Sequence, residues 1–81
     1  MANRAMIEQQ LRDAERHVAD GRDIVAQQQM IIAELEVDGH DAVQARALLK
    51  TYQGIQHMLE AHRDRLKETL LVRVLKCSLL H

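Results

Sequence analysis

The sequence predicts an all-α fold: an antiparallel, coiled-coil-like two-helix hairpin that pairs with a second copy into a four-helix bundle. Three observations predict it. Good helix formers dominate the 81 residues, and proline, tryptophan and phenylalanine are absent. Two long segments carry apolar residues at alternating steps of three and four, the period of packed helices. One short glycine-containing segment separates them, so residues 1–81 are expected to form a single domain.

The first helix is expected over about residues 3–37. Its apolar row alternates between steps of four and three, a heptad rhythm. The row comprises Ile7, Leu11, Ala14, Val18, Gly21, Val25, Gln28, Ile32 and Leu35. Ile24 and Ile31 widen the row on one side, so this helix has more apolar surface than one partner helix covers.

The segment Asp38-Gly39-His40-Asp41 is expected to be the turn, at residues 38–41. Two carboxylates and an imidazole in four residues also suggest a metal or catalytic site. A structural reading accounts for each position: Gly39 takes the positive φ that ends a helix, and Asp41 caps the next helix. Gln44 then completes a capping box. We therefore interpret the segment as a corner, since a metal site needs three or four convergent ligands.

The second helix is expected over about residues 42–77. Its predicted apolar row is Ala45, Leu48, Tyr52, Ile55, Leu59, His62 and Leu66. Beyond Leu66 the phase slips, and apolar residues spread over a wide arc. A short loop makes the helices antiparallel, with facing residue numbers adding up to about 79. The expected cross-helix pairs are Gly21 with Met58 or Leu59, Gln28 with Tyr52, and His17 with His62.

A single hairpin buries only a narrow stripe, and ordering each residue costs about 1.5 kcal/mol. Surplus apolar surface therefore implies more helices, most simply from a second hairpin in a homodimer. A helical protein partner is the alternative. The expected interface residues are Ile24, Ile31, Leu49, Leu70, Leu71, Val74 and Leu75.

Charge and composition narrow the function classes. The net charge of −1 gives no basic footprint for nucleic acid. Residues 1–38 carry four arginines against eight acids, and residues 39–81 carry seven basic residues against four acids, which favours two segments side by side. One cysteine and the absence of a signal-peptide pattern indicate a cytoplasmic protein. No nucleophile, base and oxyanion set appears, so we expect no enzyme and no cofactor.

Two alternatives remain open. His17 and His62, with Asp13 one turn before His17, form a candidate metal-binding or pH-responsive site. Leu70–Leu80 is a candidate for binding at a membrane surface, although Arg73 and Lys76 interrupt it and it is about half as long as a spanning helix.

Two stretches carry a resemblance to known proteins: Leu11–Leu49, with "AERHVADG" and "ELEVDGHD", and His62–Leu66, "HRDRL". In these stretches, about half of the chain, the sequence resembles short uncharacterised bacterial helical-hairpin proteins. The resemblance implies a helical hairpin and carries no activity with it. The tail after Lys67 departs from the group's pattern, which usually ends in a shorter charged helix.

Overall fold

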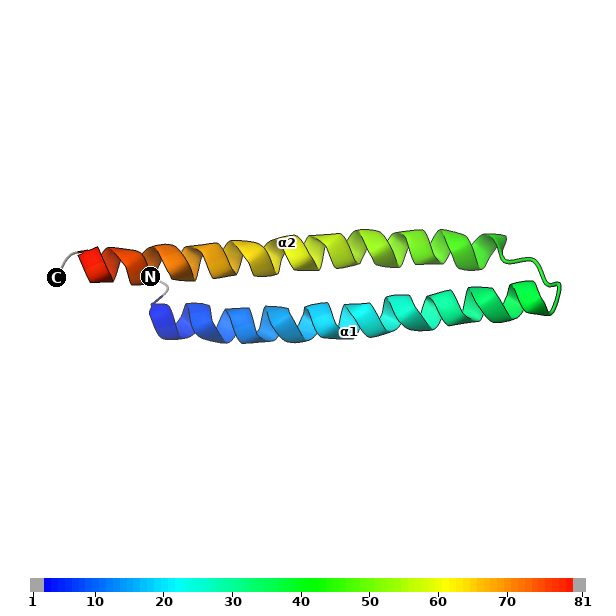
Figure 1. Cartoon of the computed structure of the whole chain (residues 1–81), viewed down its shortest axis with the longest axis horizontal. Helices are drawn as coiled ribbons and strands as arrows, with labels where there is room; N and C mark the ends of the chain where they lie inside the picture. The colour runs from blue at the N-terminus through cyan, green and yellow to red at the C-terminus, as the bar shows by residue number, and fades with distance from the viewer. Residues whose placement is uncertain (1–2, 80–81) are drawn as a thin grey trace.

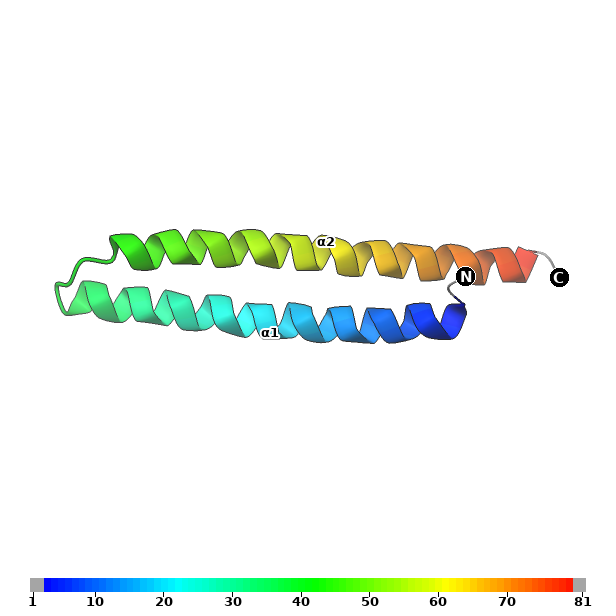
Figure 2. The same ribbon diagram turned by 180° about the vertical axis from the view of Figure 1, so that it is seen from behind.

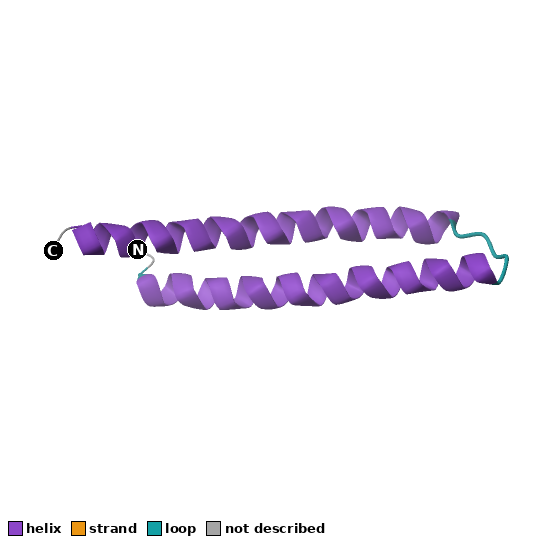
Figure 3. Cartoon of the chain, in the orientation of Figure 1, coloured by secondary structure: helices purple, strands orange, loops and turns teal. Residues whose placement is uncertain are grey.

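The computed structural model describes residues 3–79, which form two long helices joined by one short loop (Figure 1). Helix α1 covers Arg4–Val37, and helix α2 covers Val43–Leu79. The helices pack antiparallel along their length, and the described residues contain no strand (Figure 3). The predicted all-α hairpin is confirmed. It is a rod of 65 × 19 × 14 Å, in which the end of α2 projects beyond the start of α1 (Figure 2).

The two ends of α1 are capped by local hydrogen bonds. The side chain of Asn3 accepts from the amide of Met6 at 2.8 Å. At the other end, Gly39 has a φ of 75°, which only glycine adopts without strain. The amide of Gly39 donates to the carbonyl of Glu36, and the amide of His40 donates to that of Leu35. This pair of bonds is a Schellman motif, which ends the helix and turns the chain back.

The start of α2 differs by one residue from the sequence expectation. Asp41 Oδ1 accepts from the amide of Val43 at 2.9 Å. The first helical bond, however, runs from the amide of Arg46 to the carbonyl of Ala42. Ala42 is therefore the residue before the helix, and Gln44 is its second residue. The predicted capping box is wrong, because it needs Gln44 as the third helical residue.

The apolar row of α1 is confirmed along its whole length. Every one of its predicted positions from Ile7 to Leu35 is buried or half-buried against α2. Ile7 and Val18 are only 3% and 2% exposed. Because its residues recur at alternating steps of three and four, this row faces α2 along the length of the hairpin.

The row predicted for α2 is wrong at three positions. Leu48, Ile55 and His62 are exposed, whereas the next residue in each case is buried or half-buried. The observed row is Ala42, Ala45, Leu49, Tyr52, Gln56, Leu59, Arg63, Leu66 and Leu70. It keeps the alternation of three and four up to Leu70, so the expected phase slip after Leu66 does not occur.

Candidate functional site

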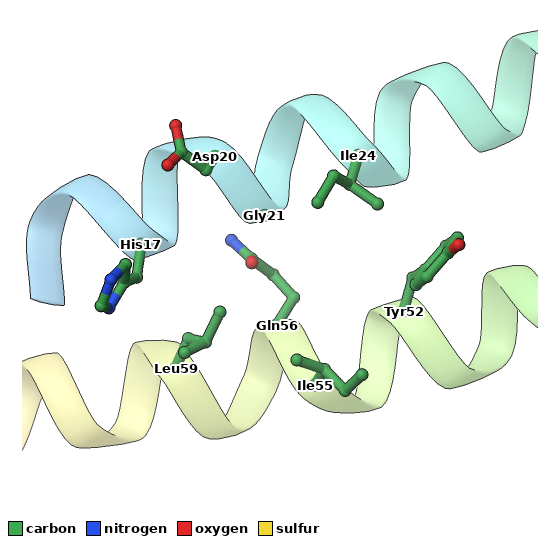
Figure 4. A pocket seen from close by; sticks show the side chains of 8 residues that line it. All are labelled: His17, Asp20, Gly21, Ile24, Tyr52, Ile55, Gln56 and Leu59. Carbon is green, nitrogen blue, oxygen red and sulfur yellow. The ribbon is translucent and has the colours of Figure 1, made fainter.

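One side of the hairpin carries an uncovered apolar surface. Ile24 and Ile31 lie on α1, one heptad apart, and Leu48 and Ile55 lie on α2 at the same spacing. These four side chains, here called the apolar face, are 42–49% exposed. Ile24 and Ile55 line the same hollow between the helices (Figure 4). The neighbouring Met58 is 71% exposed and extends the surface.

The hollow in the apolar face has a volume of about 270 Å³. Ile24 forms one side of it, Ile55, Tyr52 and Leu59 form the other, and His17 lies at one end (Figure 4). It is a shallow groove between two helices, lined mainly by hydrocarbon. Such a surface suits an apolar side chain of another helix better than a polar substrate.

The floor of the hollow is formed where Gly21 meets Gln56. A Cβ atom at Gly21 would overlap Oε1 of Gln56, so a larger residue would displace the end of this side chain. Gln56 is 6% exposed, and its Nε2 donates to the carbonyl of Val18 at 2.8 Å. Among the described residues, its Oε1 is the one buried side-chain polar atom without a hydrogen-bond partner. The expected pairing of Gly21 with Leu59 lies close to this arrangement, whereas Met58 points outward.

The opposite side of the hairpin is polar. Arg46 Nη2 and Glu36 Oε1 form an ion pair of 2.6 Å between the helices. A second hollow on this side is lined by Arg22, Val25, Ala26, Gln29, Gln53, Gln56, His57 and Glu60. Because charges and amides dominate here, this side is suited to face water. The hairpin therefore has one apolar and one polar side.

The residues expected at an interface fall into three groups. Ile24 and Ile31 lie on the apolar face. Leu49, Leu70 and Val74 are half-buried instead, and the first two belong to the row that packs against α1, so they are already partly covered within the hairpin.

Leu71 and Leu75 form the third group and are 58% and 51% exposed. Counted by heptads, they lie on the side of α2 that points away from α1 and not on the apolar face. Within residues 3–79, neither helix has a stretch long and apolar enough to cross a membrane. Leu80, the end of the candidate membrane-surface segment, lies outside the described residues.

His17 and His62 are both exposed and line a common hollow, together with Asp13, Gln10 and Ala14. The expected approach of the two histidines is thus observed. Over residues 3–79, however, no three His, Cys, Asp or Glu side chains come together closely enough to hold a metal ion. Gly39 and Asp41 lie at the far tip, where they shape the turn.

Leu48 and Ile55 belong to the apolar face, whereas the sequence prediction placed them in the row of α2 that packs against α1. The spacing of apolar residues in α2 indicates the correct row. The row through Leu49 and Gln56 runs from Ala42 to Leu70 without a phase slip, whereas the row through Leu48 and Ile55 needs one.

The fold and the surface were compared with known proteins. No family model matches the chain, and no curated protein or solved structure shows significant similarity to it. The resemblance to helical-hairpin proteins therefore stays a prediction.

Proposed function

We propose that this chain is a non-enzymatic interaction protein that self-associates through its apolar face, forming a four-helix bundle from two hairpins. The observation that carries the proposal is the exposure of Ile24, Ile31, Leu48 and Ile55 on one side of a two-helix rod. Burying apolar surface contributes about 25 cal/mol per Å², and a specific dimer buries about 800 Å² per partner. That is about one eighth of the 6339 Å² that the hairpin exposes.

The thin core of the hairpin is a physical reason for self-association. Over the described residues, its core consists of one narrow row in which the buried apolar side chains are Ile7, Ala14, Val18, Ile32 and Ala42. None of the large side chains there is less than 2% exposed. Small domains with a core this thin commonly gain stability by oligomerising. A reducing, cytoplasmic setting is part of the proposal, since the single Cys77 forms no intrachain disulfide.

Sedimentation equilibrium over a wide range of protein concentration tests the proposal. We expect a dimer for the natural chain and at least a tenfold weaker association for Ile55→Lys, because a lysine ammonium group would lose water at the interface. Met30→Lys is the matched control: Met30 is 64% exposed, and its heptad position lies on the outer side of α1. A monomer at all concentrations, or equal effects of the two substitutions, would contradict the proposal.

A helical partner protein and a metal-responsive role are the competing functions. A monomeric, partly helical chain that becomes fully helical on binding another helix would favour the first. The second rests on the shared hollow of His17 and His62. Isothermal titration with zinc and nickel tests it, with His17→Ala as the comparison; saturable binding that the substitution abolishes would favour a metal site.

A further inference from the structure

The two rows that form the apolar face have the same order of side chains from the tip to the open end. On α1 the residues at heptad spacing are Asp38, Ile31, Ile24 and His17. On α2 they are Asp41, Leu48, Ile55 and His62. Each row therefore begins with an acid, continues with two apolar residues and ends with a histidine. All eight positions are at least partly exposed; seven lie in or directly at the ends of the helices, and Asp41 lies in the turn.

When either row is read in the opposite direction, its histidine takes the place of its acid. Its two apolar residues then exchange places with each other. In α1 the centre of this exchange lies between residues 27 and 28, and in α2 it lies between residues 51 and 52. These two centres are close together along the rod, since both rows begin at the turn and end at His17 and His62, which line one hollow. One two-fold axis perpendicular to the helices can therefore serve both rows at once.

We propose that the second copy docks antiparallel on the apolar face, so that each helix lies on the same helix of its partner. This inference rests on the proposed self-association. In this arrangement Ile24 packs on the partner's Ile31, and Leu48 packs on the partner's Ile55. At the ends of the contact, His17 faces the partner's Asp38 and His62 faces the partner's Asp41. The interface is isologous, apolar in the middle and polar at both ends, as stable interfaces are.

Charge argues against the parallel alternative. With both tips at the same end, the acidic tips of the two copies would meet; each carries Glu34, Glu36, Asp38 and Asp41. Only Glu36 has a cationic partner in the described structure, Arg46 on the polar side. The histidines would then face histidines. Like charges placed opposite each other oppose association, whereas the antiparallel arrangement pairs Asp38 and Asp41 each with a histidine.

The charged groups around these contacts set the expected pH dependence. Asp13 and Asp20 of α1 and Arg65 of α2 line the hollows that contain His17 or His62. Glu34, Glu36 and His40 lie near the acids of the tip. A histidine that gains a proton strengthens its hydrogen bond to a carboxylate. A dimer in which each histidine faces a carboxylate is therefore expected to associate more tightly at lower pH.

A distance between spin labels tests the orientation. The labelled chain carries His40→Cys at the tip and Cys77→Ser, so that each copy has one label. The tip lies about 13 residues from the proposed axis, which at about 1.5 Å per residue separates the two labels by about 40 Å. Parallel docking would bring them within about 20 Å. A distance near 40 Å supports the antiparallel arrangement, and a short distance overturns it while leaving the dimer intact.

Two controls separate this inference from the proposed self-association. Sedimentation of the same labelled chain shows whether it dimerises; a monomer means that the proposed function itself fails. His17→Gln with His62→Gln keeps a hydrogen-bond donor but removes the titrating group. We expect the dimer of this variant to form with the same label distance and to lose most of the pH dependence. An unchanged pH dependence would overturn the pairing of histidines with the acidic tip.

Discussion

Gln56 of α2 donates from Nε2 to the main-chain carbonyl of Val18 in α1, at 2.8 Å and in a buried position. A second glutamine makes the reverse contact: Gln28 of α1 donates to the carbonyl of Ala45 in α2 at 2.9 Å. The expected partner of Gln28 was Tyr52, and that expectation is wrong. In each helix, the side-chain amide of one glutamine thus donates to a main-chain carbonyl of the other helix. Since a shift of either helix would break both bonds, the pair fixes the register of the hairpin.

Gly21→Ala is expected to destabilise the hairpin. A methyl group at residue 21 displaces the side chain of Gln56 and breaks its bond to Val18, at a cost of about 2 kcal/mol, which outweighs the gain of about 1 kcal/mol in helix propensity. Gly54→Ala is the matched control, because a Cβ at residue 54 meets no atom within 4 Å. It should raise the stability by about 1 kcal/mol. Urea unfolding at one protein concentration measures both; a stabilised Gly21→Ala chain would contradict the overlap.

Gln56→Ala should reverse the effect of the alanine at residue 21. With the long amide side chain gone, the new methyl group fills space beside Leu59, whose Cδ1 would lie 3.4 Å away. Gly21→Ala is then expected to stabilise the Gln56→Ala chain by about 1 kcal/mol, so the coupling in the double-mutant cycle amounts to about 2 kcal/mol. Additive effects of the two substitutions would show that residues 21 and 56 do not share this space.

The choice between Ile55 and Gln56 shows how far the sequence predicts this fold. Periodicity located both helices within one or two residues, and the glycine at 39 located the turn. Periodicity also assigned Ile55 to the packed row, because isoleucine is apolar and glutamine is polar. The structure places Gln56 there instead, since Gly21 leaves room on the other helix and a carbonyl accepts its amide. Both conditions depend on which residues of the two helices face each other. The unbroken row from Ala42 to Leu70 indicates that Gln56 belongs to the packed row, but it does not show these two contacts.

Because of the same error in the row of α2, part of the candidate site was predicted at the wrong residues. Leu48 and Ile55 were expected inside the hairpin, so the predicted interface consisted of Ile24, Ile31, Leu49 and the end of α2. Once the row of α2 is shifted by one residue, an apolar surface lies on one side of the rod, across both helices. The acids and histidines at its ends were visible in the sequence, but their relation to the apolar residues depended on that shift.

Gln28→Ala is expected to lower the free energy of unfolding by about 1 kcal/mol. The buried amide of Gln28 donates to the carbonyl of Ala45, and an alanine loses that bond and leaves unfilled space. Gln27→Ala, at the exposed neighbouring position, is the control and should leave the stability within about 0.5 kcal/mol of the natural chain. Thermal and urea unfolding give both values. Equal changes at residues 27 and 28 would mean that the bond between the helices contributes nothing.

Gly39→Ala should destabilise the chain by about 1–2 kcal/mol although the added methyl group meets nothing. No atom lies within 4 Å of a Cβ at residue 39, so the whole cost comes from its φ of 75°, where a side chain meets its own backbone. Asparagine tolerates this conformation better, and Gly39→Asn should therefore lose less. Melting followed by circular dichroism, with Gly54→Ala as the control for a helical glycine, orders the variants. If Gly39→Ala were as stable as the natural chain, the helix would have to end without the Schellman motif.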